Sequence, residues 1–304
     1  MSPRLLVYVI PMVLVWGSQA GVVRRALEGL PANVVVFYNL SAALVLLVPY
    51  LALTGRFRAL SRHPAGTWLR LVITGLVGSW LYYVFLFHGL KIVGQDGVIE
   101  VNMMNYLFPI MSVIFSALIL KERVTVIGAI SIAISFSGAY VVLTHGNVWA
   151  LKLADWQGPA LGFLAAVCWG IFTALGRKWA PEPVSAIFVY FLTGWVLSVL
   201  MLPFASGPKI PTTQQLGFLL WAGMLSNCLG AILWFKALAV SNATLVGNLA
   251  YSAAFLSVFV INRLNGSPIR VSSLMGLCII ALGVILASRY GTGKSIIPAP
   301  SPSQ

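Results

Sequence analysis

Ten long apolar stretches, separated by short polar segments, constrain this chain more than any other feature of its sequence. A single α-helix crosses a bilayer with about 20 apolar residues, and these stretches lack the strict alternation of membrane β-strands. We therefore predict an all-α membrane protein with ten transmembrane helices. The approximate stretches are Leu5–Val23, Val34–Leu53, Trp68–Leu90, Val98–Leu120, Val124–Thr144, Pro159–Gly176, Val184–Phe204, Leu216–Leu238, Leu245–Asn262 and Ser272–Ser288.

The composition excludes a water-soluble fold. Only 8% of the 304 residues are charged and 60% are hydrophobic, whereas a soluble domain carries about 25% charged residues. The net charge of +13 therefore indicates basic loops between membrane helices and not a nucleic-acid-binding surface. The three cysteines lie inside apolar stretches and the three histidines are scattered. We expect no disulfide framework, no metal site and no cofactor.

The distribution of Lys and Arg predicts the orientation. With the N-terminus inside, twelve basic residues fall in cytoplasmic segments and seven outside, which together account for all 19. Cytoplasmic loops carry the excess of positive charge, so we predict that both termini are cytoplasmic in a multi-pass protein of the inner membrane. Arg24 and Arg25 argue locally for the opposite orientation. The segment 291–304 is rich in Pro and Ser and is predicted to be a disordered tail.

An internal repeat divides the chain at about residue 150. Each half would contain five spans, so the second half would be inserted upside down relative to the first, which is the architecture of many secondary transporters. We predict two inverted five-helix repeats, residues 1–150 and 151–290. The alternative readings are chance matches in a Trp-rich and Gly-rich chain and a first span that is a cleaved signal peptide ending near Ser18–Ala20. The matching positions are Trp16-Gly17 with Trp169-Gly170, Pro31 and Tyr38 with Pro183 and Tyr190, Leu90 with Leu238, Glu100 with Asn248, and Gly128 with Gly276.

These residues resemble a known family. Two five-helix halves, each opening with a Trp-Gly helix that ends in basic residues, resemble the EamA-type ten-helix carriers of the drug/metabolite transporter superfamily. The segment IEVNMMNYLFP at 99–109 is similar to the fourth helix of the bacterial aromatic amino-acid exporter branch, and Leu14–Leu30 to its first helix. The resemblance implies an inner-membrane exporter of amino acids or similar small metabolites.

The strongest candidates for a substrate site lie on the fourth and ninth stretches. An ionisable residue inside a span is costly and usually functional, and Glu100 is such a residue. Glu100, Met103 and Met104 share one helix face, and Asn248, Tyr251 and Ser252 share another. Each face offers a polar group beside soft or aromatic surface, which suits a small amphipathic solute. Alternatively, Glu100 lies near the membrane interface or pairs with Lys91.

Aromatic side chains inside other spans are candidates for the walls of the same site, because pockets for organic solutes are lined by aromatic residues. Membrane anchoring at the interface is the alternative role for tryptophan. The candidates are Trp16 with Gln19, Trp169 with Thr173, Tyr82, Tyr83 and Trp234.

Five further residues are assigned gating or structural roles. Asn105, Tyr106 and Pro109 form the stripe opposite Glu100, where polar groups more often bond neighbouring helices than solutes. Pro109 leaves the carbonyl of residue 105 without a helical partner and is predicted to bend the helix. His88 and Lys236 end the third and eighth stretches as matching positions, and either cap their helices or gate the two mouths.

The function predicted from these features is a secondary carrier that exports small metabolites, most specifically amino acids, by alternating access. Glu100 is either a proton-exchanging carboxylate or a fixed charge in a facilitator. A multidrug exporter of the same superfamily is one alternative. An intramembrane transferase would need clustered Asp, His or Cys, and a channel would need a ring of repeated polar positions; neither is found. The expected partners are a small-molecule substrate and lipid, and one chain suffices to enclose a pathway.

Overall fold

The computed structural model describes residues 2–61, 63–93, 98–147, 149, 156–180, 182–264 and 271–290. The predicted tail, 291–304, lies outside these residues. The described chain is helical, with the following elements: α1 (Pro3–Leu27), α2 (Ala32–Leu53), α3 (Phe57–Ser61), α4 (Ala65–Gly75), η1 (Leu76–Leu81), α5 (Tyr82–Ile92), α6 (Val98–Asn105), α7 (Phe108–Leu120), α8 (Val126–Leu143), α9 (Gln157–Trp179), α10 (Pro183–Met201), η2 (Leu202–Phe204), α11 (Thr213–Leu220), η3 (Trp221–Leu229), α12 (Gly230–Val240), α13 (Ala243–Ala250), α14 (Ser252–Leu264) and α15 (Val271–Tyr290).

The helices have the length and surface of membrane spans. Among the described residues, eight helical stretches are long and apolar enough to cross a bilayer, and Ala243–Phe259 is a shorter apolar helix. Large apolar side chains such as Val126, Leu118 and Leu282 lie exposed on the outside, where in water they would be unfavourable and in lipid they are solvated. The chain is therefore an all-helical, multi-pass membrane protein.

The two halves of the chain contain the same irregularities in the same order. The third helical stretch of each half carries a π-helical segment at its centre, η1 in one and η3 in the other. The fourth stretch of each half is interrupted, between α6 and α7 at Tyr106–Leu107 and between α13 and α14 at Tyr251. π-Helical turns are rare in α-helices and frequent at functional sites. Their recurrence in both halves of the chain therefore indicates that the middle of each third stretch belongs to a functional region.

Matching helices of the two halves run antiparallel. In the α8–α15 pair, Thr125 Oγ1 donates to Tyr290 O at 3.3 Å, so the start of α8 meets the end of α15. In the α2–α10 pair, Trp195 Nε1 donates to Ser41 Oγ at 3.0 Å, while Arg56, just beyond the end of α2, meets Glu182, the N-cap of α10.

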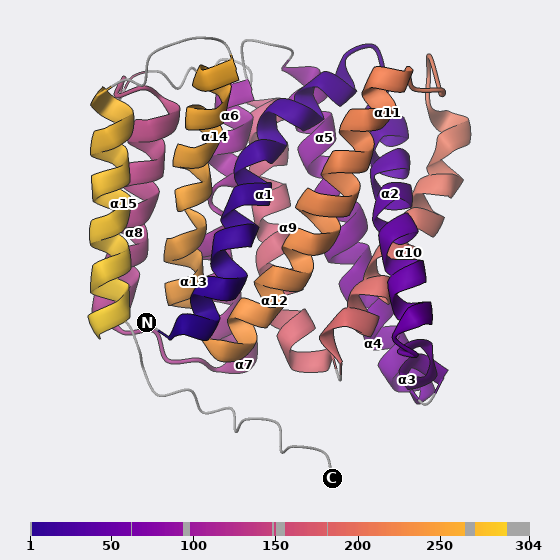
Figure 1. Ribbon diagram of the computed structural model, residues 1–304, viewed down its shortest axis with the longest axis horizontal. Helices are drawn as coiled ribbons and strands as arrows, with labels where there is room; N and C mark the ends of the chain where they lie inside the picture. Colours follow the sequence, from indigo (N-terminus) through magenta and orange to yellow (C-terminus); the bar gives the residue numbers. More distant parts are fainter. Residues whose placement is uncertain are drawn as a thin grey trace.

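Figure 1 shows the helices side by side and allows two edges of the molecule to be defined. The lower edge is the one at which α1 begins and α15 ends; the upper edge is the one at which α1 ends and α15 begins. From lower to upper edge run α4–η1–α5 and α13–α14, whereas α6–α7 and α11–η3–α12 run from upper to lower. Each broken or π-helical stretch therefore has one part near the upper edge and one part near the lower edge.

The element bounds correct one sequence-based correspondence. α5 ends at residue 92 and α12 at residue 240, an offset of 148, but α6 begins at residue 98 and α13 at residue 243, an offset of 145. The offset falls by three because the connection between the third and fourth stretches is three residues shorter in the second half. Asn248 therefore corresponds to Met103, and Glu100 corresponds to Leu245.

The packing of α8 on α15 requires the same correction. An ideal Cβ on Gly138 would lie 2.7 Å from Gly276 O, and one on Gly283 would lie 2.7 Å from Ser131 O. These two close approaches are exchanged by an offset of 145, which matches Gly138 with Gly283 and Ser131 with Gly276. The prediction that matched Gly128 with Gly276 was wrong by three residues.

Candidate functional site: a central cavity of aromatic and amide side chains

A cavity occupies the centre of the molecule and extends toward the upper edge. Its volume is about 710 Å³, including the space that opens to solvent. The lining residues of α1 lie in the middle and upper parts of that helix, and those of α5 lie above the centre of the α4–η1–α5 stretch. Asn102 and Asn105 belong to α6, the upper part of the α6–α7 stretch. The lining consists of Trp16, Gln19, Val23, Tyr82, Leu86, Phe87, Leu90, Asn102, Asn105, Tyr106, Phe108, Trp169, Asn227 and Ala253.

The chemistry of this lining is uncharged. Six of the lining side chains are aromatic, and four are the amides Gln19, Asn102, Asn105 and Asn227. Solute pockets typically combine apolar and aromatic walls with a few fixed polar groups. Recognition here relies on amide dipoles and aromatic faces, because no side chain of the lining carries a formal charge.

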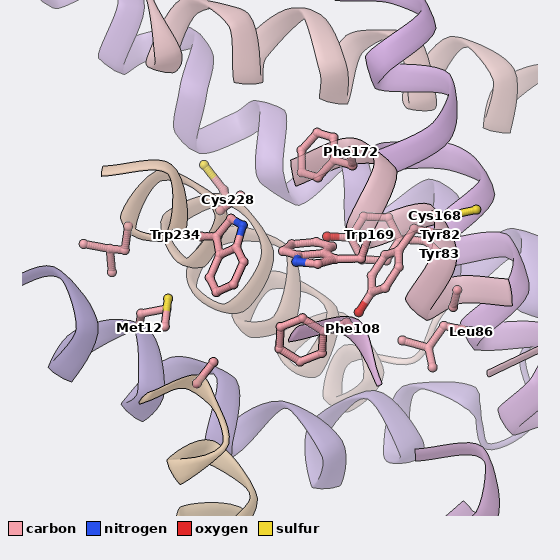
Figure 2. Close-up of a cluster of buried hydrophobic side chains, with 14 of the residues drawn as sticks. Met12, Tyr82, Tyr83, Leu86, Phe108, Cys168, Trp169, Phe172, Cys228 and Trp234 are labelled. Atoms are coloured by element: carbon pink, nitrogen blue, oxygen red, sulfur yellow. The ribbon is translucent and has the colours of Figure 1, made fainter. Parts of the chain in front are cut away.

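Four aromatic rings meet at the inner end of the cavity and form an aromatic tetrad, Trp16, Phe108, Trp169 and Trp234. Their six centroid separations lie between 5.5 and 6.3 Å. Aromatic pairs at these separations and tilted geometries attract one another beyond their burial. Trp169 lies between Trp234 and the two tyrosines Tyr82 and Tyr83 (Figure 2), with the Tyr82 ring centroid 4.9 Å away. The tetrad is therefore the floor of the cavity.

Interrupted helices position much of the wall. Pro109 occupies an N-terminal position of α7 and cannot donate a backbone hydrogen bond, and the chain turns at Tyr106–Leu107. The helix is interrupted just before the proline, and the predicted bend itself stays a prediction. Asn102, Asn105 and Tyr106 line the cavity on one side of the interruption and Phe108 on the other.

Below the tetrad, the space between the same helices is filled by buried side chains. Trp234 is fully buried, and its Nε1 donates to Thr173 Oγ1 at 3.0 Å. Met12 and Phe172 are also buried in this region (Figure 2). The Lys236 ammonium lies 6.0 Å from the centroid of the Tyr8 ring, within cation–π range, which joins α12 to α1.

Two ion pairs close the lower edge itself. Arg177 at the end of α9 donates to Glu122 Oε1 at 2.6 Å, and both side chains are only 13% and 12% exposed. Arg56 after α2 contacts Glu182 at the start of α10 at 2.5 Å, with 38% and 32% exposure. The first pair is the more shielded from solvent screening, so it makes the stronger electrostatic contribution.

The structure brings part of the predicted substrate site together. Trp16, Gln19, Tyr82 and Trp169 line the cavity, as do two residues that were assigned structural or gating roles, Asn105 and Tyr106. Whether any of them binds solute stays a prediction.

For α6 the structure reverses the predicted face. Glu100, Met103 and Met104 were expected to face the solute, but none of them is among the lining residues. Glu100 is 7% exposed and Met103 1%. An ideal Cβ on Gly162 of α9 would lie 2.4 Å from Val101 O and 3.3 Å from Met104 Cβ. This close contact with α9 turns the opposite face, with Asn102 and Asn105, toward the cavity.

The other predicted residues lie behind or below the cavity. Tyr83 is buried behind Tyr82, Trp234 is the fully buried member of the tetrad with Thr173 bonded to it, and Pro109 packs against Gly247. His88 Nδ1 bonds to Val84 O at 2.8 Å. Lys236 lies at Tyr8, below the floor.

The predicted face of α13 serves helix packing. Asn248 is fully buried; it accepts from Ser135 Oγ at 2.6 Å and donates to Ser131 Oγ at 3.3 Å, which joins α13 to α8. Tyr251 is buried with its ring centroid 6.0 Å from that of Phe136, and Ser252 begins α14 half-buried.

Sequence reasoning missed several wall residues. Asn227 and Phe108 carry the most chemistry among them, and Val23, Leu86, Phe87, Leu90 and Ala253 add apolar surface. Asn227 had a detectable signal, since it is an amide in the middle of an apolar stretch. It lies in η3, whose wide turn could not be inferred from periodicity.

The fold and cavity define a helical membrane protein built around a solute-sized chamber. The EamA-like transporter family model matches residues 4–144 and again residues 156–289. The chain belongs to this family, and it is a multi-pass membrane transporter of the drug/metabolite transporter superfamily.

Individual relatives agree with this assignment. The chain is 25% identical over 226 residues to an uncharacterized transporter, YyaM, of Bacillus subtilis, covering 71% of this chain and 72% of that one. It is 25% identical over 289 residues to an uncharacterized transporter of Archaeoglobus fulgidus, covering 91% and 94%. It is 24% identical over 209 residues to the aromatic amino acid exporter YddG of Ancylobacter novellus, covering 66% and 68%.

A crystal structure has the same fold. It superposes with a TM-score of 0.79 at 19% identity and covers 96% of this chain and 99% of the other.

Proposed function

We propose that this transporter is a secondary carrier that exports small metabolites, aromatic amino acids first among them, across the inner membrane by alternating access. The observation that carries the proposal is a central chamber, lined by aromatic rings and amides, that extends toward the upper edge and has the aromatic tetrad as its floor. A wall of rings and dipoles suits a solute with an aromatic body and a polar end.

An inverted repeat of ten spans is part of this proposal. What supports it is the antiparallel pairing of α2 with α10 and of α8 with α15, which are matching helices of the two halves. The first helix of each half also packs on the third stretch of the other: Trp16 of α1 contacts Gly230, and Phe172 of α9 contacts Gly78. When each half contributes its first helix to the packing of the other half, the two halves can rock around a central site.

Orientation follows from charge. With the lower edge cytoplasmic, as the Lys and Arg count favours, the cavity extends toward the outside and the closed half faces the cytoplasm. During export, solute would enter from the cytoplasm when the tetrad and the lower-edge ion pairs separate. It would leave through the cavity in the conformation described here.

The amino-acid specificity draws on the relative named an aromatic amino acid exporter and on the aromatic wall. Export of drugs or other metabolites is the alternative within the same mechanism. The uncharged lining favours recognition without a titrating carboxylate at the solute, so we assign the chain a facilitative mechanism in preference to proton exchange at Glu100.

The test is counterflow of labelled L-phenylalanine into proteoliposomes. We expect wild-type protein to accumulate label and Trp169→Ala to lose at least about tenfold of the rate, because the variant removes both a wall and part of the floor. Trp156→Ala is the matched control, since Trp156 lies just before the same helix with 67% exposure. Equal rates for the two variants would remove the cavity from the pathway, and competition by dyes but not by amino acids would favour the drug-export alternative.

A further inference from the structure

Three amide side chains form a hydrogen-bonded chain from the cavity wall into the protein. Gln19 Nε2 donates to Asn227 Oδ1 at 2.9 Å, and Asn227 Nδ2 donates to Asn39 Oδ1 at 2.8 Å. Gln19 and Asn227 line the cavity, whereas Asn39 is completely buried behind them. We call this set the amide chain.

Close backbone packing holds the amide chain in place. Asn39 lies on α2 and Asn227 in η3, and an ideal Cβ on Gly223 of η3 would lie only 2.2 Å from Asn39 O. Any side chain at residue 223 would force α2 and η3 apart, so glycine is required for this distance. The contact fixes the position of the Asn39 acceptor relative to the Asn227 donor.

A second pair of bonds fixes α1 to η3. Trp16 Nε1 donates to Ser226 O at 2.9 Å, and Ser226 Oγ donates to Val15 O at 2.6 Å. Gln19 follows Trp16 by less than one helical turn, so its amide is brought to Asn227 by the same attachment. The amide chain is therefore organised before any solute binds, which lowers the ordering cost of binding.

The direction of donation sets what the cavity offers. Both N–H groups used in the chain point away from the cavity, toward Asn39. No described residue donates to Gln19 Oε1, and this oxygen is not among the buried atoms without a partner. An amide whose N–H donates is polarised and accepts more strongly at its oxygen. Gln19 Oε1 is thus a strengthened acceptor beside the ring of Trp16.

We infer that Gln19 Oε1, oriented by Asn227 and Asn39, is the acceptor for a donor nitrogen of the solute, so that the site selects aromatic solutes that carry an amino group. Asn39 is a positioning residue in this scheme, because it does not reach the cavity. The ring faces of Trp16 and Tyr82 would stabilise the positive charge of a protonated amine. The inference rests on the proposed function and deepens it by naming the group that is read.

The experiment uses two probes with the same ring and charge. 2-Phenylethylamine has N–H donors, and its N,N,N-trimethyl derivative has none. Each is measured as a competitor of phenylalanine counterflow and, separately, by the rise in melting temperature of purified protein, which reports binding directly. A hydrogen bond from a charged donor is stronger than one between neutral groups, so wild-type protein should bind the amine at least about tenfold more tightly.

The variants separate orientation from packing. Asn39→Leu removes the acceptor at the inner end, and the amine preference should fall to about parity. Asn39→Asp keeps an acceptor oxygen and should retain the preference. Ser41→Ala is the matched control on α2, because it removes a bond to Trp195 on the lipid-side pair α2–α10 and leaves the amide chain intact. If Asn39→Leu does not fold, Gln19→Leu is measured in its place.

The outcomes distinguish the two proposals. A wild-type protein without amine preference, or a preference that persists in both Asn39→Leu and Gln19→Leu, overturns the inference while phenylalanine counterflow leaves the proposed function standing. Absence of counterflow together with a melting-temperature rise specific to the amine overturns the proposed function and supports the inference.

Discussion

The upper and lower halves of the core are built from the same helices yet differ in packing. Above the tetrad, α1, α5 and α6 leave a cavity lined by amides. Below it, α1, α9 and α12 are closed by buried rings, a cation–π contact and ion pairs. Elements that recur in the same order in both halves of the chain therefore need not pack equally at the two edges of the molecule. In the proposed mechanism the two packings would exchange.

The most damaging single change should be in the closed half. Trp234→Ala empties a fully buried site and removes the 3.0 Å hydrogen bond to Thr173 Oγ1, which keeps only the longer bond from Ser112 Oγ at 3.3 Å. Truncation of a buried tryptophan costs about 3–5 kcal/mol, so the melting temperature should fall sharply in detergent. Trp234→Phe, which keeps a ring, should recover much of this loss, and equal melting temperatures for the two would contradict the tetrad's role.

The Arg177–Glu122 pair should hold the lower edge closed. Glu122→Gln removes the charge from a pair that is mostly shielded from water, at a cost of about 1–3 kcal/mol once the remaining exposure is allowed for. The measurement is maleimide labelling of Met12→Cys, a position fully buried below the tetrad, after the three native cysteines are changed to serine. Faster labelling is expected; a rate unchanged by Glu122→Gln would mean that the pair does not control this half.

In the open half, a wall substitution should alter binding and leave stability almost unchanged. Asn102→Ala removes an amide from the cavity side of α6, where a hydrogen bond to solute is worth about 0.5–1.5 kcal/mol. We expect about a fivefold weaker apparent affinity for phenylalanine in counterflow, with the melting temperature unchanged. A large loss of stability would show that Asn102 supports the packing of α6 and is not merely part of the wall.

The smallest effect should come from Arg56→Gln. The Arg56–Glu182 pair is about one third exposed, and exposed pairs contribute about 0–1 kcal/mol. Labelling of Met12→Cys should change much less than with Glu122→Gln. A larger effect of Arg56→Gln would reverse the ranking of the two ion pairs that burial predicts.

The sequence predicted the class of fold and part of the chamber for physical reasons. Apolar length and scarce charge require membrane helices, and aromatic residues inside spans, such as Trp16, Tyr82 and Trp169, have few locations other than a core or a chamber. Pro109 indicated an irregular helix at this point, because the loss of its backbone donor is a local effect.

The rest depended on tertiary contacts. Periodicity assigned Asn105 and Glu100 to different faces of one helix, but it could not say which face meets α9. That choice is made by Gly162, whose lack of a side chain lets α6 approach closely. Likewise, Asn39 and Asn227 are 188 residues apart, and no local pattern joins them. The register error at Asn248 arose because a three-residue change in one connection leaves every helix intact.

The length and tilt of the third stretches, α4–η1–α5 and α11–η3–α12, make this protein sensitive to the thickness of its bilayer. Ala65–Ile92 and Thr213–Val240 each contain 28 residues, or about 40 Å of helix against about 30 Å of hydrocarbon, and α11–η3–α12 is visibly inclined in Figure 1. A thicker membrane would favour more upright helices. Because these helices carry Tyr82 and Trp234, lipid chain length should shift the balance between the two ends of the chamber without any change in the protein.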